Sequence, residues 1–258
     1  MTPELLDDLK SGGEKYVRYD EDTLDQYQTD EEGNPHFFKK PEVVVFPGST
    51  EEVASIVKLA NQYLVPITPR AAGSGVACGA IPIYHGMVVE LERMNKILEL
   101  NANAMYAVVQ TGVYCAQLQE EAKKHGLLYA ADPSSASSSQ VGGNVANNAG
   151  GNKAVKYGTT RNQIYALKVV TPTGDIVDVG HGCKNARLAL LWNSFLLVPR
   201  ERSASLRKLR SSCVPCRHTV SIWSVYSRRM KKPLPCPIRS LKPVDPTSLN
   251  IWITRPLS

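Results

Sequence analysis

The composition of the chain changes abruptly near Gly180, and this break divides it into two regions. Residues 1–180 carry 15 Lys and Arg against 22 Asp and Glu, a net charge of −7, whereas residues 181–258 carry 15 against 2, a net charge of +13. Seventeen of the 18 glycines precede residue 181, and all three tryptophans follow it. The overall charge of +6 therefore describes neither region.

The size and hydropathy of the chain predict a soluble globular protein. A length of 258 residues with 43% hydrophobic content is enough for one large or two small domains with a core. No apolar run approaches the ~20 residues of a membrane span, and the opening "MTPELLDDLKSGGEKY" is too acidic for a secretory signal. We therefore expect a cytoplasmic location and no transmembrane segment.

Strand and helix patterns alternate along the first region. The β-branched run "EVVVF" predicts a buried strand, and "STEEVASIVKLANQYL" predicts a helix with Ser49 as N-cap and Glu52 completing a capping box. The segment "CAQLQEEAKKHG" predicts a second helix that stops at Gly126. Further strands are expected at "VPITP", "GMVVELERM", "AVVQTGV" and "ALKVVTPTGDIVDV", the last with a hairpin turn. The pattern is that of an α+β domain.

Two clusters of small residues follow strand patterns and point to a ligand. In "PRAAGSGVACGAIP" the backbone N–H groups can form a concavity for phosphate, and a plain surface turn is the alternative. A nicotinamide-type dinucleotide fold is disfavoured because Pro82 stands where its helix would begin. In "DPSSASSSQVGGNVANNAGG" small side chains let a planar ring approach, while Asn and Ser offer donors and acceptors. A flexible linker is the alternative there, but strand-like segments flank the cluster on both sides.

Seven segments, in this order and spacing, resemble the flavin domain of the vanillyl-alcohol-oxidase superfamily, also called PCMH-type. They are "PEVVVFPGSTEEVASIVKLANQYLVPITPRAAGSG", "MVVELERMNKIL", "VVQTGV", "DPSS", "GGNVANNAGG", "KYGTT" and "VVTPTGDIV". These segments are most similar to those of the glycolate oxidase flavoprotein subunit and of D-lactate and D-2-hydroxyglutarate dehydrogenases. The resemblance implies an FAD-binding domain over residues 41–180 after a lead segment, 1–40. Its two α/β subdomains, about 41–100 and 101–180, would hold FAD in the crevice between them.

The resemblance also implies which residues bind the cofactor. The first cluster would cradle the FAD diphosphate, with Arg70, Ala71, Ala72, Gly73, Ser74, Gly75, Val76, Cys78 and Gly79. The second would line the flavin and ribityl chain, with Asp132, Pro133, Ser134, Gly142, Gly143, Asn144, Asn147, Asn148 and Gly151.

Two positions depart from the family pattern, and one role stays open. Ala71 and Ala72 replace glycines, and Ser74 stands where covalent members place a His, so FAD is expected to bind noncovalently. For Arg70, a phosphate contact and a solvated surface cation are both open.

The basic tail, residues 181–258, lacks what the family would show there, namely a Gly-Ser-Glu-Gly-Thr-Leu-Gly segment, a substrate-binding cap and a C-terminal element with metal or substrate ligands. Codons permitted for Val198–Arg210, translated two bases later, give Ser-Glu-Gly-Thr-Leu-Gly-Ile-Ile-Thr-Glu-Thr-Thr. We therefore hypothesise that the reading frame changes soon after Gly180, which leaves a disordered or poorly folded tail in place of the cap. A zinc site at Cys213, Cys216 and His218 is disfavoured because no second ligand pair follows.

The function implied by the resemblance is oxidation of a small 2-hydroxy acid by hydride transfer to flavin N5, with a possible electron-acceptor protein as partner. The catalytic residues are unknown, no metal is expected, and this chain is expected to be inactive and to bind FAD weakly. A noncatalytic FAD-binding fragment is an alternative. Nucleic-acid binding through the tail is disfavoured because no nucleic-acid-binding motif accompanies its arginines. The peptidoglycan-precursor reductase of the same superfamily is disfavoured by the "DPSS" and "GGNVANNAGG" segments.

Overall fold

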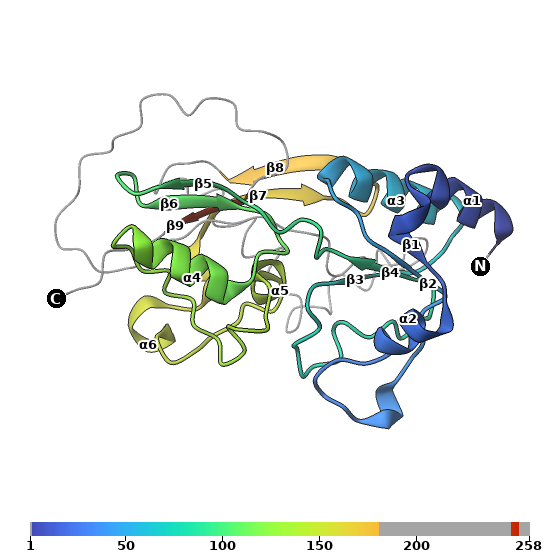
Figure 1. Cartoon of the computed structure of the whole chain (residues 1–258), viewed down its shortest axis with the longest axis horizontal. Helices are drawn as coiled ribbons and strands as arrows, with labels where there is room; N and C mark the ends of the chain where they lie inside the picture. The colour runs from blue at the N-terminus through green and yellow to red at the C-terminus, as the bar shows by residue number, and fades with distance from the viewer. Residues whose placement is uncertain (1, 181–248, 253–258) are drawn as a thin grey trace, which may run out of the picture. The chain divides into compact units, whose positions relative to one another are not determined.

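The computed structural model describes residues 2–180 and 249–252, and the structural statements below concern these residues (Figure 1). They form two compact units, one of residues 2–94 and 169–177, the other of residues 95–168, 178–180 and 249–252. The first unit ends at Met94 and also contains residues 169–177, whereas the subdomain boundary was expected at about residue 100. The expectations for the tail, including Cys213, Cys216 and His218, lie outside the described residues, apart from 249–252.

The first unit is built on a four-stranded, mainly parallel sheet in the order β1-β2-β4-β3. Its strands are β1 (Val17–Arg18), β2 (Val43–Val45), β3 (Ile67–Arg70) and β4 (Met87–Glu90). Strands β2 and β3 both pair with β4 in parallel, and β1 is antiparallel to β2. Every residue of β2 and β4 is buried, as expected for parallel strands that are covered on both faces.

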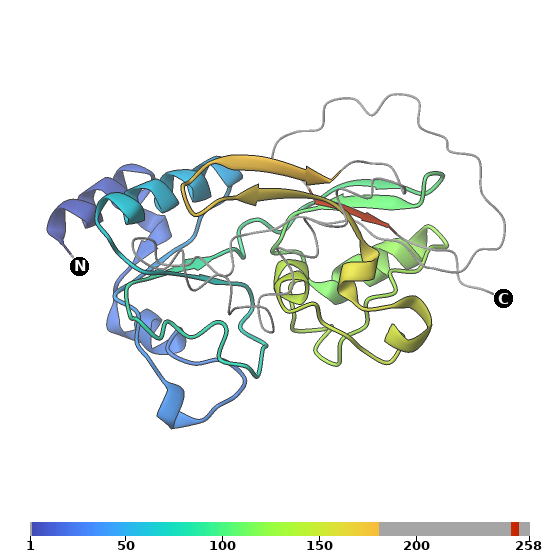
Figure 2. The same ribbon diagram turned by 180° about the vertical axis from the view of Figure 1, so that it is seen from behind.

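Helix α3 (Thr50–Gln62) supplies much of the core of the first unit. The Ser49 side chain accepts from the Glu52 N–H at 3.1 Å, as expected for the N-cap, but the Glu52 carboxylate accepts from the Gly48 N–H at 2.7 Å. The buried face of α3 packs in one cluster with Leu5 and Leu9 of α1 (Pro3–Ser11). The two helices lie side by side in Figures 1 and 2.

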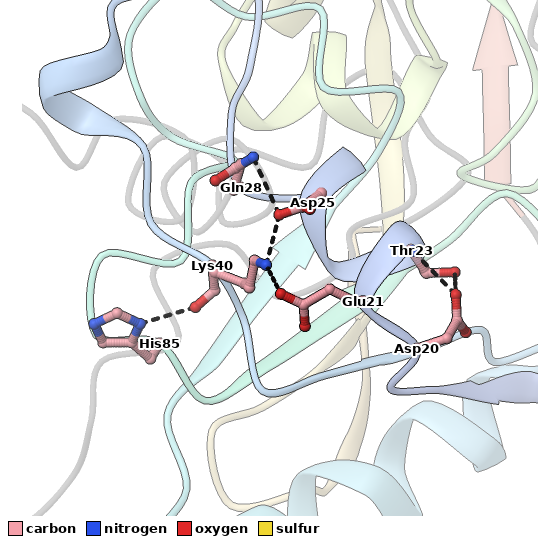
Figure 3. Close-up of polar contacts among 7 residues, drawn as sticks. All are labelled: Asp20, Glu21, Thr23, Asp25, Gln28, Lys40 and His85. Atoms are coloured by element: carbon pink, nitrogen blue, oxygen red, sulfur yellow. Dashed lines mark hydrogen bonds and ion pairs between the residues drawn. The ribbon is translucent and has the colours of Figure 1, made fainter.

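The lead segment is an integral part of the first unit. Its β1 pairs with β2, and it also contains α2 (Glu21–Gln26) and the short 3-10 turns η1 (Glu14–Tyr16) and η2 (Pro35–Phe37). Lys40 Nζ lies 2.5 Å from Glu21 Oε1 and 2.6 Å from Asp25 Oδ1, while His85 Nδ1 donates to the Lys40 carbonyl at 2.8 Å (Figure 3). The lead segment therefore reaches the turn that precedes β4.

The second unit is built on a sheet in the order β5-β6-β9-β7-β8, although residues 169–177, at the hairpin end of β7 and β8, belong to the first unit. The strands are β5 (Ile97–Asn101), β6 (Tyr106–Val109), β7 (Ile164–Val170), β8 (Ile176–Gly180) and β9 (Leu249–Trp252). The β5-β6, β6-β9 and β9-β7 pairs are antiparallel. The remaining elements are α4 (Cys115–Lys124), α5 (Val141–Ala146), α6 (Ala154–Tyr157) and η3 (Thr160–Gln163). Helices α4 and α5 lie on the same side of this sheet in both ribbon views.

The structure confirms the predicted strands β2, β3, β4 and β6, the β7-β8 hairpin and the helices α3 and α4. Strand β5 was not predicted. The second small-residue cluster is not wholly a loop, because α5 lies within it. Val141 and Val145, one helical turn apart and both buried, anchor this helix despite its two glycines. None of the helices in the described ranges is long and apolar enough to cross a membrane.

Candidate functional site

Arg70 supports the first small-residue cluster from within the first unit. It ends β3, and its Nη1 donates to the Thr29 carbonyl at 2.6 Å and to the Ala80 carbonyl at 3.4 Å. Its guanidinium carbon lies 5.1 Å from the centroid of the Tyr27 ring. Only 9% of Arg70 is exposed, which excludes the solvated surface cation. The side chain links the two ends of the cluster to the lead segment.

Arg70 also faces a buried carboxyl group. Glu90 pairs with Arg70 in the register of β4 and β3, and Glu90 Oε2 lies 4.0 Å from Arg70 Nε. Burial raises the pKa of Glu90 to about 8, and the Arg70 charge offsets part of that rise. Burial also lowers the pKa of Arg70, but a guanidinium keeps its charge in proteins. Of the two side chains, Glu90 is therefore the one that changes its protonation state with pH.

The backbone of the first cluster rests directly on Arg70. Gly73 has a φ of +69°, and a Cβ added there would overlap the Arg70 guanidinium. The Gly73 carbonyl accepts from the Glu31 N–H at 3.3 Å. Glycine is thus required at this position for both its backbone angle and the close approach of Arg70.

The rest of the first cluster is partly open and contains no helix, as predicted. Half-buried positions are Ala71, Ala72, Ser74, Gly75, Cys78 and Gly79. Val76 is exposed, and a Cβ added to Gly79 would meet no atom within 4 Å. Gly79 therefore faces open space.

The second cluster is closed by a contact between its ends. A Cβ added to Gly151 would overlap the Asp132 carbonyl, so only glycine permits this approach. Lys153 Nζ lies 3.1 Å from Asp132 Oδ2, and Gln119 Nε2 donates to the Ala131 carbonyl at 2.8 Å. Pro133 is buried beside this contact, and Ser134 is exposed. The two ends of the second cluster are thus held together within the second unit.

The asparagines of the second cluster differ in their surroundings. Asn148 Oδ1 accepts from Thr159 Oγ1 at 2.8 Å and from the Arg161 N–H at 2.9 Å, which is a structural use of that side chain. Asn147 is exposed. Asn144 is buried, and its Nδ2 donates to no atom of the described residues. Gly142 and Gly143 are half-buried in the first turn of α5.

Sequence reasoning missed three buried polar residues beside Asn144. Thr111 Oγ1, Ser139 Oγ and Gln140 Oε1 are buried and have no hydrogen-bond partner within the described ranges. Ser139 and Gln140 stand inside the second quoted cluster, whereas Thr111 stands inside "VVQTGV", where no pattern singled it out.

The described residues give no candidate metal site, and the Cys115 thiol is inert. No three His, Cys, Asp or Glu side chains gather there as metal ligands would. Cys115 is buried, and burial raises the pKa of its thiol to about 12, so it stays protonated and unreactive.

Three comparisons with known proteins agree with this geometry. The family model described as "FAD binding domain" matches residues 41–180. D-lactate dehydrogenase from Anaerostipes hadrus is 42% identical over 180 residues, which cover 70% of this chain and 38% of that protein. D-2-hydroxyglutarate dehydrogenase from Stutzerimonas stutzeri is 42% identical over 178 residues, covering 69% and 38%. The chain thus spans less than two fifths of the length of these relatives.

Solved structures show the same fold. Alkyldihydroxyacetonephosphate synthase superposes with a TM-score of 0.64 at 25% identity, covering 77% of this chain and 39% of that one. 4-Ethylphenol oxidase from Gulosibacter chungangensis gives 0.64 at 23% identity, covering 98% and 42%. The α+β fold is the PCMH-type fold of the superfamily that the sequence resembles, and the chain belongs to the FAD binding domain family.

Proposed function

We propose that this chain binds FAD noncovalently through the two small-residue clusters. The first cluster takes the diphosphate, because its backbone is free of helix, partly open and supported by the buried Arg70 cation. The second takes the flavin and ribityl chain, because its small residues let a planar ring approach and its exposed Ser134 and Asn147 offer donors and acceptors. The observation that carries the proposal is the family match over 41–180, which contains both clusters.

The absence of histidine from the first cluster supports noncovalent binding. Ser74 cannot form the histidyl bond to flavin, and the two histidines of the first unit, His36 and His85, lie outside residues 70–79. Affinity then depends on hydrogen bonds and on burial of the cofactor. Each is lost when the protein unfolds, so denaturation releases the flavin.

The proposed reaction is the oxidation of a small 2-hydroxy acid. Relatives named D-lactate dehydrogenase, D-2-hydroxyglutarate dehydrogenase and glycolate oxidase subunit share 35–42% identity with this chain. Bound FAD supplies a two-electron acceptor for such an oxidation. The residues assigned here hold and orient the cofactor, and none is proposed as the base that removes the hydroxyl proton. A cytoplasmic location and an electron-acceptor protein belong to the same proposal.

The proposal includes the change of reading frame after Gly180. The family match ends at residue 180, where glycine content falls and the net charge changes sign. We therefore expect the 258-residue chain to oxidise no 2-hydroxy acid and a frame-restored protein to oxidise one.

The test compares the two proteins with FAD in a dye-coupled assay against D-lactate, glycolate and D-2-hydroxyglutarate. Turnover by the 258-residue chain alone would refute its inactivity. A frame-restored protein without turnover on any of the three acids would refute the substrate class. Sequencing the gene decides the frame separately, because a single intact frame whose codons cannot encode the shifted motif contradicts the change.

A further inference from the structure

The Arg70 guanidinium lies inside the protein, directly against the backbone of the first cluster. It contacts Gly73, where an added Cβ would overlap it. Its Nη1 also donates to the Thr29 and Ala80 carbonyls, which hold the side chain in place. Only 9% of Arg70 is exposed. A ligand on the cluster would therefore experience the charge of Arg70 whether or not it touches the side chain.

The first cluster brings no charge of its own. Residues 71–84 contain no Asp, Glu, Lys, Arg or His, so the charge behind the cluster backbone is that of Arg70, Glu90 and the groups facing them. The titratable groups that face this pair are Tyr27 and Asp30, beside Arg70, and Glu92, beside Glu90. Burial raises the pKa of Glu90 to about 8, so its charge changes close to neutral pH.

Glu90 is placed so that its charge can cancel that of Arg70. The two residues are cross-strand partners in β4 and β3, and Glu90 Oε2 lies 4.0 Å from Arg70 Nε. Their side chains are only 5% and 10% exposed, so little water screens the two charges. With Glu90 protonated the pair carries the positive charge of Arg70, and with Glu90 ionised the pair is neutral.

We propose that Glu90 controls the affinity of the first cluster for the FAD diphosphate through Arg70, so that the folded chain binds FAD more tightly when Glu90 is protonated. This role rests on the proposed function, which puts the diphosphate on the first cluster. Glu90 acts through Arg70 and needs no contact with the cofactor. Because coupling between two sites is reciprocal, bound FAD must strengthen the binding of the Glu90 proton by the same factor.

The expected pH dependence follows from the charges. The diphosphate of FAD stays doubly ionised at neutral and alkaline pH, so an ionised Glu90 repels it and offsets its attraction to Arg70. FAD affinity is therefore highest at pH 6, where Glu90 is protonated, and falls as the pH rises through about 8. A buried charge acting over about 10 Å at an effective dielectric constant of about 20 changes a binding constant about tenfold.

The test measures the Kd for FAD by equilibrium dialysis of the 258-residue chain at pH 6 and at pH 9.5. We expect the wild-type Kd to rise about tenfold between the two pH values. In Glu90→Gln, which is neutral and similar in size, the Kd is expected to stay near the wild-type value at pH 6. Circular dichroism at each pH verifies that the chain is folded. A Glu90 that is purely structural would change the Tm of the variant but not the pH dependence of its Kd.

The matched control is Glu92→Gln. Glu92 is an exposed carboxylate two residues further along the chain, and its charge contributes to the raised pKa of Glu90. The variant is expected to keep the tenfold rise in Kd, with the midpoint at a slightly lower pH. Loss of the rise in Glu92→Gln would show that surface charge in general, and not Glu90, controls the affinity.

Proton uptake tests the same coupling without any substitution. A tenfold coupling moves the pKa of Glu90 up by about one unit in the complex, so FAD binding near pH 8.5 should take up about half a proton. Titration calorimetry in two buffers of different ionisation enthalpy measures this uptake. FAD binding without proton uptake at pH 8.5 would overturn the role of Glu90 even if Glu90→Gln did not fold.

The outcomes distinguish this role from the proposed function. A folded wild-type chain that binds no FAD at either pH contradicts both. A wild-type chain that binds FAD with the same Kd at pH 6 and pH 9.5 overturns the role of Glu90 alone. The same holds if Glu90→Gln shows the full wild-type rise in Kd, because another group would then cause it.

Discussion

The two small-residue clusters are supported in opposite ways. In the first unit a buried cation, Arg70, contacts main-chain carbonyls and faces the buried Glu90. In the second unit Gly151 contacts the Asp132 carbonyl directly, and the ion pair of Asp132 with Lys153 is partly exposed. The first cluster therefore depends on a buried charge, whereas the second depends on the close approach of two main-chain segments. Changes of charge, of pH and of side-chain volume at glycine positions should therefore affect the two units differently.

The largest effect is expected at the second cluster, from Gly151→Ala. The added methyl would overlap the Asp132 carbonyl, so we expect a loss of more than about 4 kcal/mol in the free energy of unfolding. Gly150→Ala is the matched control, because its Cβ would meet only Thr159 Cγ2 at 3.8 Å and Ala154 Cβ at 4.0 Å. Urea titration measures both variants, and equal stabilities would contradict the contact.

A smaller loss in the free energy of unfolding is expected at the first cluster, from Arg70→Met. The change removes the hydrogen bonds to Thr29 and Ala80 and leaves Glu90 without its counter-charge, at a cost of about 3 kcal/mol at pH 8. The loss should be smaller at pH 5, where Glu90 is protonated, and should be partly recovered by adding Glu90→Gln. A loss of stability that is independent of pH would show that the charges of Glu90 and Arg70 do not interact.

Glu90 alone should give the first unit a pH dependence. Its pKa is about 8 in the folded chain against 4.5 ordinarily, so the folded state binds the proton more tightly. This stability is fully present below pH 4.5 and is lost as the pH rises towards 8, by at least about 1 kcal/mol. Glu90→Gln should remove that slope in urea titrations from pH 5 to pH 8, and an unchanged slope would assign it to another group.

The smallest effect is a difference in thiol reactivity. Cys78 is half-buried in the first cluster, whereas Cys115 is buried with its pKa raised to about 12. We expect Cys78 to be alkylated faster and FAD to slow its alkylation, as followed by mass spectrometry of tryptic peptides. Faster labelling of Cys115, or no effect of FAD on Cys78, would disagree with this arrangement.

Local patterns predicted much of this fold because they act over a few residues. The apolar spacing and the Ser49 cap of α3, and the turn at Gly174 between β7 and β8, need no distant partner. Helix α5 was missed because Val141 and Val145 outweigh Gly142 and Gly143 only once they are buried by the rest of the unit. Propensity within the segment does not contain that information.

The site was predicted as a set of small residues, but the reasons for them lie far apart in sequence. Gly151 is required by the Asp132 carbonyl and Gly142 by Thr111, so both glycines serve contacts within the protein. Sequence spacing gives no sign that Arg70 would reach back to Thr29. Thr111 was not selected because a single threonine after a strand has no pattern of its own.

Binding of FAD by the purified 258-residue chain tests the central claim most directly. The chain is brought to equilibrium with FAD across a dialysis membrane, which detects weak binding, and the flavin absorbance on its side is recorded before and after acid precipitation. We expect excess flavin on the side of the folded chain and its entire recovery in the acid supernatant. A folded chain that carries no flavin would contradict binding through the two clusters, and flavin that stays with the precipitate would contradict noncovalent attachment.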